Sequence, residues 1–183
     1  MTKRLFVAVP VSKEVQERIK AIYQPLKNTG ADLKFVPLEN LHFTVKFLGD
    51  VEESKITELV EKIKTFVSNR NRFSVDLKGV GAFLNNNSIK VIWVGADNPN
   101  LISLIKDLDK ELDCLKKNEQ EEIPHLTIAR VKSEKNKEKL ADFIKKFATE
   151  NFGSIVVEKL ILYESKLTRE GPNYTLLGEW DLK

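Results

Sequence analysis

The chain has 183 residues, of which 42% are hydrophobic and 31% are charged, and its formal net charge is +3. This length predicts a single domain over residues 1–183, built as two small lobes that share a core. The mild positive charge permits a nucleic-acid partner without requiring one. A single cysteine, Cys114, excludes an internal disulfide and fits a reducing compartment. Neither a signal-peptide pattern nor a run of ~20 apolar residues occurs, so we expect a cytoplasmic monomer with no membrane segment.

Hydrophobic periodicity predicts four helices and a larger number of strands. Apolar residues at helical spacing mark the helices, and alternation or short apolar runs mark the strands. The helices are expected at Ser12–Asn28 with Ser12 as N-cap, at Glu52–Val67, at Pro99–Leu112 and at Glu134–Phe147. The strands are expected at Arg4–Val9, Leu33–Val36, Phe73–Phe83, Ile89–Val94, Phe152–Leu162 and Tyr174–Leu182, and around His42 and His125. A hairpin turn is expected at Asn85–Ser88 and a charged loop at Lys116–Glu122.

Both histidines of the chain occur in one tetrapeptide pattern, His-apolar-Thr-apolar, which begins at His42 and again at His125. In a strand, residues i and i+2 point to the same face. His42 therefore shares a face with Thr44, and His125 shares a face with Thr127. If the two strands face each other, two imidazoles and two hydroxyls converge on one site.

Two imidazoles suit acid–base catalysis because both protonation states of histidine are accessible near neutral pH. One can take a proton from an attacking oxygen while the other gives a proton to a leaving oxygen, and threonine hydroxyls can donate hydrogen bonds to an anion. These groups predict phosphodiester cleavage without a metal or cofactor. A zinc site would need more histidine or cysteine ligands than the chain offers, and the G-x-S-x-G motif of a serine nucleophile is absent.

Two cations lie near the motifs. Lys46, four residues after His42, is expected on the face of His42, where it either holds a phosphate or reaches into solvent, while Val45 and Phe47 face the core. Arg130 follows His125 by five residues and would point away in a regular strand, but a bulge or strand end near Ala129 would turn it back.

The motifs and their flanks resemble the two-histidine (2H) phosphoesterases, and within them the LigT-like RNA 2′,3′-cyclic phosphodiesterases, once described as 2′-5′ RNA ligases. The resemblance runs in order through four segments: Arg4–Val9, Asn40–Gly49, Pro124–Arg130 and Glu164–Tyr174. It implies a bilobal fold with one motif per lobe. It also implies His42 as proton donor, His125 as base, Thr44 and Thr127 on the phosphate oxygens, and Arg130 as a ligand of the substrate phosphate.

The fold class expected from these patterns is α+β. Strand pairs joined by short turns predict antiparallel sheets with helices on the outer face. The repeated motif predicts two pseudo-symmetric lobes with an active-site groove between them. Phe6 and Tyr163 are candidates for base stacking, although aromatic residues in such runs are more often part of a core.

The resemblance leaves the physiological substrate open. An RNA end with a 2′,3′-cyclic phosphate is expected, in tRNA fragments or short oligonucleotides, and a small cyclic phosphate such as a nicotinamide-nucleotide derivative is the alternative. Run in reverse, the same site could join RNA ends through a 2′-5′ linkage. The competing interpretation is a non-catalytic module that binds RNA ends or nucleotides.

Overall fold

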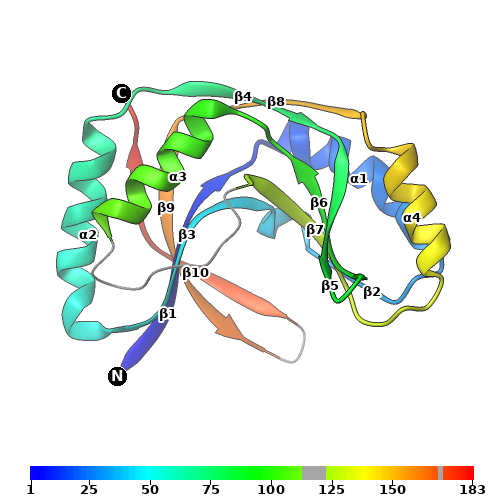
Figure 1. The fold of residues 1–183 in the computed structure, drawn as a ribbon. Helices are drawn as coiled ribbons and strands as arrows, with labels where there is room; N and C mark the ends of the chain where they lie inside the picture. Colours follow the sequence, from blue (N-terminus) through cyan, green and yellow to red (C-terminus); the bar gives the residue numbers. More distant parts are fainter. Residues whose placement is uncertain (113–122, 169–170) are drawn as a thin grey trace.

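The computed structural model describes residues 1–112, 123–168 and 171–183. Within these residues ten strands, four α-helices and one 3₁₀-helix form the fold (Figure 1). The helices are α1 (Lys13–Asn28), α2 (Glu53–Ser68), α3 (Pro99–Glu111), α4 (Lys137–Lys146) and the 3₁₀-helix η1 (Leu38–Asn40). The strands are β1 (Thr2–Pro10), β2 (Leu33–Phe35), β3 (His42–Glu52), β4 (Phe73–Lys78), β5 (Val80–Asn85), β6 (Ser88–Gly95), β7 (His125–Val131), β8 (Asn151–Val157), β9 (Lys159–Leu167) and β10 (Pro172–Asp181).

One eight-stranded sheet organises the molecule. Its strand order is β10-β9-β1-β3-β7-β6-β5, with β2 paired to β7 beside this path, and β4 and β8 form a separate two-stranded sheet. Every strand pair in the described residues is antiparallel. The predicted α+β class with antiparallel sheets is therefore confirmed, and β3 and β7, which carry the two motifs, are neighbours in the middle of the sheet.

Each lobe takes elements from both halves of the sequence. Helices α2 and α3 contact each other and both contact β3, whereas α4 contacts β5 and α1. Figure 1 shows α2 and α3 on one side of the molecule, with α1 and α4 on the other. The chain therefore crosses between the lobes, and a single hydrophobic cluster that runs from Leu5 to Leu182 joins them.

Local signals in the sequence place several element ends correctly. The Ser12 hydroxyl accepts a hydrogen bond from the Val15 N–H at 3.3 Å, as expected for an N-cap. Pro99 occupies the first turn of α3 behind an Asn98 cap. At the β5–β6 turn Asn86 and Asn87 have φ values of 48° and 61°, the left-handed geometry of a tight hairpin.

Two predicted strands are in fact divided. The expected strand Phe73–Phe83 breaks at Gly79, whose φ is 77° and where a Cβ would lie 2.4 Å from the Ala148 carbonyl oxygen. Phe152–Leu162 breaks at Glu158, so β8 pairs with β4 while β9 belongs to the main sheet. In both cases the chain leaves one sheet and enters the other, which an apolar pattern alone does not reveal.

Smaller differences concern element ends. Helix α4 begins three residues later than expected, after a turn in which Asn136 has a φ of 55°. Between β2 and β3 the chain forms the 3₁₀-helix η1. The expected loop Lys116–Glu122 and Cys114 lie outside the described residues. Among the helices that the structure describes, none has the length and apolar character needed to cross a membrane.

Candidate active site

The two motif strands meet at one cross-strand pair, Phe43 of β3 opposite Leu126 of β7. Antiparallel register then places His42 opposite Thr127 and Thr44 opposite His125. Phe43 and Leu126 are buried in the core, whereas the four polar side chains are half-buried on the other face of the sheet. The pairing brings both histidines and both threonines together, as the repeated motif predicted.

Both imidazoles are held in the same way. His42 Nδ1 lies 2.7 Å from the carbonyl oxygen of Asn40, and His125 Nδ1 lies 2.9 Å from that of Ile123, in each case two residues earlier. A carbonyl oxygen can only accept, so in both rings Nδ1 carries the proton and donates. Nε2 is then the ring nitrogen left for chemistry, as a base when neutral and as an acid when protonated.

Aromatic rings surround the two imidazoles. The His42 ring lies 5.0 Å from the Phe6 ring and 5.5 Å, nearly perpendicular, from the Tyr174 ring. The His125 ring meets the Phe83 ring edge-on at 4.6 Å. Burial lowers the pKa of His42 below its ordinary value, and the charge of nearby His125 lowers it further, although the hydrogen bond to Asn40 acts in the opposite direction.

Phe6 packs beside His42 in a cluster of aromatic rings. It is only 2% exposed and is packed between the rings of Tyr163, at 5.4 Å, and Tyr174, at 4.9 Å. Of the two residues considered for base stacking, Phe6 is therefore buried, while Tyr163 is half-buried. Tyr174 and Phe83 contact the imidazoles, but no pattern in the sequence marked them as site residues.

The expectation that Lys46 shares the face of His42 is wrong. Val7 of β1 pairs with Lys46 but Ala8 pairs with Thr44, so Val45 is an extra residue in β3 and forms a β-bulge. The bulge reverses the alternation: Val45 and Lys46 both point into the core, and Phe47 turns to the site face, where its ring lies 5.8 Å from that of Phe6.

Lys46 has a partner in its buried position. The side chain is 1% exposed, and its Nζ contacts Asp109 Oδ1 and the Asp109 carbonyl oxygen near the end of α3. The negative end of the α3 dipole also stabilises a cation at this position. Lys46 therefore joins β3 to α3 and is not available to a phosphate.

A matching bulge lies in the second motif strand. Ile92 of β6 pairs with Ala129 but Trp93 pairs with Thr127, so Ile128 is the extra residue. Ile128 and Ala129 are both fully buried, and Arg130 returns to the face of Thr127, exposed. The expected bulge near Ala129 is thus confirmed. Burial raises the pKa of Tyr174, and the positive charge of nearby Arg130 lowers it by a smaller amount.

The described residues contain no group of three or more His, Cys, Asp or Glu side chains arranged to hold a metal ion. The side chains that surround the two imidazoles are instead aromatic and threonine residues, with Arg130 at the edge. The site thus combines two acid–base groups, neutral hydrogen-bond donors and one cation.

Comparison with known proteins agrees with this geometry. The family model described as LigT-like phosphoesterase matches residues 9–93 and again residues 94–174, one repeat for each motif. A relative from Methanocaldococcus jannaschii, named RNA 2′,3′-cyclic phosphodiesterase, is 41% identical over 97% of this chain and 99% of its own length.

Solved structures extend the agreement to the fold. A crystal structure of a Thermus thermophilus protein superposes with a TM-score of 0.82 at 26% identity, covering 98% of this chain and 97% of the other. Escherichia coli LigT in complex with 3′-AMP superposes with a TM-score of 0.74 at 25% identity, covering 100% and 98%. The chain therefore belongs to the LigT-like phosphoesterase family.

Proposed function

We propose that the protein hydrolyses the 2′,3′-cyclic phosphodiester at an RNA end to a 2′-phosphomonoester, without a metal, by acid–base catalysis between His42 and His125. The observation that carries the proposal is the pairing of the two motif strands, which sets each histidine opposite the threonine of the other motif. The names of relatives such as the Methanocaldococcus jannaschii RNA 2′,3′-cyclic phosphodiesterase support the substrate class.

The proposed reaction needs one proton accepted and one donated. Neutral His125 takes a proton through Nε2 from water, whose oxygen attacks phosphorus. The bond from phosphorus to O3′ breaks, and protonated His42 gives its Nε2 proton to that oxygen. The products are a 3′-hydroxyl and a 2′-phosphate, and each proton transfer is typically worth about 10²–10⁴-fold in rate.

The donor role of His42 depends on the substrate. Burial lowers the pKa of His42, which favours the neutral ring. A phosphodiester anion beside the ring favours the imidazolium, because an opposite charge nearby stabilises the charged form. Substrate binding would therefore bring a proton to the histidine that must donate one.

In this mechanism Thr44 and Thr127 hold the phosphate oxygens. Each hydroxyl lies on the site face beside an imidazole, and neutral donors can follow the charge that develops on the non-bridging oxygens. Arg130 supplies a positive charge at the edge of the site for RNA phosphate groups. Both motifs lie in one chain, so a monomer contains the complete pair of histidines.

Ligation uses the same groups with a different nucleophile. If the 5′-hydroxyl of a second RNA replaces water, His125 takes its proton, O3′ leaves with the proton of His42, and a 2′-5′ linkage forms. Candidate natural substrates are tRNA fragments and short oligonucleotides in the cytoplasm.

Single histidine substitutions test the proposal. His42→Ala and His125→Ala should each lower turnover of a short RNA ending in a 2′,3′-cyclic phosphate by about 10²–10⁴-fold. Binding of the RNA, followed by fluorescence anisotropy, should survive in both variants. Unchanged turnover in either variant would overturn the paired mechanism, and binding without turnover in the unmodified protein would identify a binding module instead.

A further inference from the structure

Beyond the two motif pairs, the site face carries a third cross-strand pair, formed by Lys34 of β2 and Arg130 of β7. β2 pairs antiparallel with β7, and Lys34 stands opposite Arg130 in the register. The residues on either side of Lys34, Leu33 and Phe35, pack against the core, so alternation directs Lys34 to the same face as Arg130.

β2 and the start of β3 follow the same edge of β7, because β6 occupies the other edge. The Val36 N–H donates to the Ile128 carbonyl oxygen at 2.9 Å and bridges the two pairings. Along this edge the site face therefore presents three successive pairs: His125 with Thr44, Thr127 with His42, and Arg130 with Lys34.

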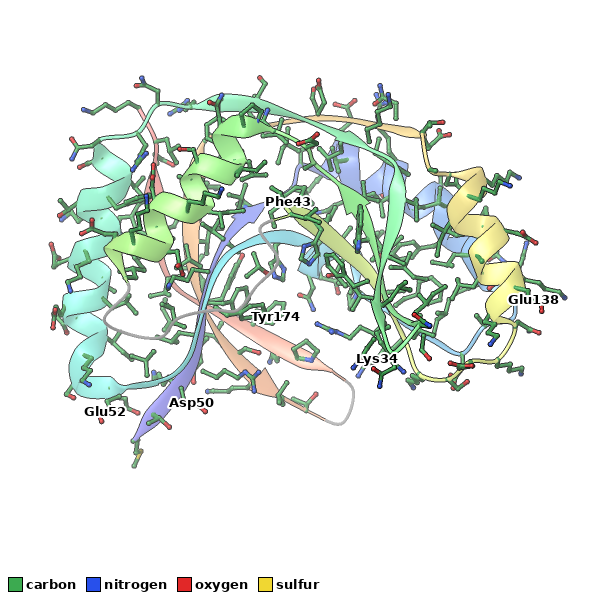
Figure 2. The ribbon with its side chains drawn as sticks, in the orientation of Figure 1. Lys34, Phe43, Asp50, Glu52, Glu138 and Tyr174 are labelled. Atoms are coloured by element: carbon green, nitrogen blue, oxygen red, sulfur yellow. The ribbon has the colours of Figure 1, made fainter. Side chains whose placement is uncertain are left out.

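Two cations directly opposite each other in a sheet repel and are unfavourable by themselves. Neither Lys34 nor Arg130 forms an ion pair with an acidic side chain among the residues that the structure describes. Lys34 is nevertheless half-buried, and its Nζ would lie 3.5 Å from a Cβ on Gly171, next to the start of β10. Figure 2 shows Tyr174 near the middle of the view and Lys34 to its right, close to the lower end of the β5–β6 hairpin.

An anion between the two cations would relieve their repulsion. Because Ile128 is the extra residue of a bulge, Arg130 lies only two residues of the partner strand beyond Thr127, from Trp93 to Val91, which is about 7 Å along the sheet. That separation places it past the two motif pairs, where a second phosphate of the same RNA chain would lie.

We infer that Lys34 and Arg130 form a subsite for the phosphodiester on the 5′ side of the terminal nucleotide, so that the enzyme favours RNA ends over cyclic mononucleotides. The inference rests on the proposed function, because the terminal cyclic phosphate is taken to occupy the histidine and threonine pairs. Lys34 binds only this second phosphate, whereas Arg130 lies between the two phosphate positions.

Three substrates test this subsite. They are adenosine 2′,3′-cyclic phosphate, a diadenosine dinucleotide ending in the same cyclic phosphate, and that dinucleotide with an uncharged methylphosphonate linkage. The unmodified protein should favour the charged dinucleotide over the other two by about tenfold in kcat/KM, mostly through KM. Lys34→Ala should lose this preference while its kcat/KM for the mononucleotide stays unchanged.

Lys90→Ala is the matched control. Lys90 is an exposed lysine on β6, the other neighbour of β7, where it is the extra residue of a bulge and has no partner in the register with β7. The control should keep the preference for the charged dinucleotide. An equal loss on all three substrates in Lys34→Ala, or no loss, would overturn the inference.

A binding measurement separates this inference from the proposed function. The affinity of a dinucleotide ending in a 2′-phosphate is compared for the charged and the methylphosphonate linkage, in the unmodified protein and in Lys34→Ala. If no substrate is turned over, the proposed function fails, but a difference of about tenfold that disappears in Lys34→Ala still supports the subsite. Equal affinity for both linkages in the unmodified protein would overturn it.

Discussion

The buried ion pair between Lys46 and Asp109 allows a prediction in which stability and activity separate. Lys46 is 1% exposed, whereas the Asp109 side chain is 40% exposed. Removing the carboxylate leaves a buried ammonium without its charged partner, whereas removing the ammonium leaves a carboxylate that water can reach. The two single substitutions should therefore differ in cost, although each breaks the same pair.

The exposed fractions set the magnitudes. Breaking a fully buried pair by removing one partner costs about 3–5 kcal/mol. Asp109→Ala should cost less, about 2 kcal/mol, because Asp109 is partly in solvent and its carbonyl oxygen still lies 3.3 Å from Lys46 Nζ. Lys46→Met should cost about 1 kcal/mol or less, since methionine fills the space without a charge.

Urea unfolding measures these changes in the free energy of unfolding, and an m-value equal to that of the unmodified protein is the check on two-state behaviour. Asp107→Ala is the matched control on the same helix: its partner Arg70 is 34% exposed and Asp107 is 33% exposed, so its loss should cost about 1 kcal/mol or less. A cost for Asp109→Ala no larger than for Asp107→Ala would show that burial of Lys46 does not make its ion pair more costly to break, and a larger cost for Lys46→Met than for Asp109→Ala would show the same.

The Lys46→Met variant also tests the position of Lys46 relative to the substrate. Because Lys46 points into the core, Lys46→Met should leave KM for the cyclic phosphate within about twofold, below the loss expected for a charged hydrogen bond. A rise in KM of tenfold or more with unchanged stability would show that Lys46 holds the phosphate after all.

Three further predictions concern the site and the break between the sheets. Thr127→Val should lower kcat/KM by about tenfold or more, because one neutral donor to the phosphate is lost, and steady-state kinetics measures this. His125→Gln should raise the pKa of His42, since the charge that lowers it is removed, and an NMR titration of the His42 ring would show no rise if the two rings do not interact. Gly79→Ala should destabilise the fold by about 2–4 kcal/mol in urea unfolding, because its φ is 77° and the new Cβ would meet the Ala148 carbonyl oxygen; a cost under about 1 kcal/mol would contradict this.

Features set by local chemistry could be predicted from the sequence. The Ser12 cap, Pro99 at the start of α3 and the asparagine turn after β5 each depend on residues a few positions apart. The shared face of His42 and Thr44, and that of His125 and Thr127, could also be predicted, because alternation fixes which side chains of a strand share a face. The pairing of the two strands was only a condition for their convergence on one site, and the register of the sheet supplies it.

The direction of Lys46 depends on a feature that alternation does not contain. A bulge adds one residue to a strand and reverses every side chain beyond it. In the second motif a bulge or strand end near Ala129 is the condition under which Arg130 turns back to the face of Thr127. In the first motif the equivalent position is a lysine, which reads as a surface residue until its partner Asp109, 63 residues later, is known.

The place of Lys34 beside the site depends on long-range strand pairing, which the sequence alone does not give. Nothing in the short segment around Lys34 indicates that it pairs with β7 opposite Arg130, because the two residues are joined only by the register of the sheet. The breaks at Gly79 and Glu158 are similar: each separates strands that pair with different partners, and no local pattern names those partners.

The most direct test of metal-independent catalysis by the two histidines is a hydrolysis reaction with EDTA present. The purified protein is incubated with a short RNA ending in a 2′,3′-cyclic phosphate, and ³¹P NMR identifies the position of the product phosphate. A 2′-phosphate is expected, formed at the same rate with and without the chelator. Turnover that stops with EDTA and returns with added metal would contradict catalysis by the two histidines alone.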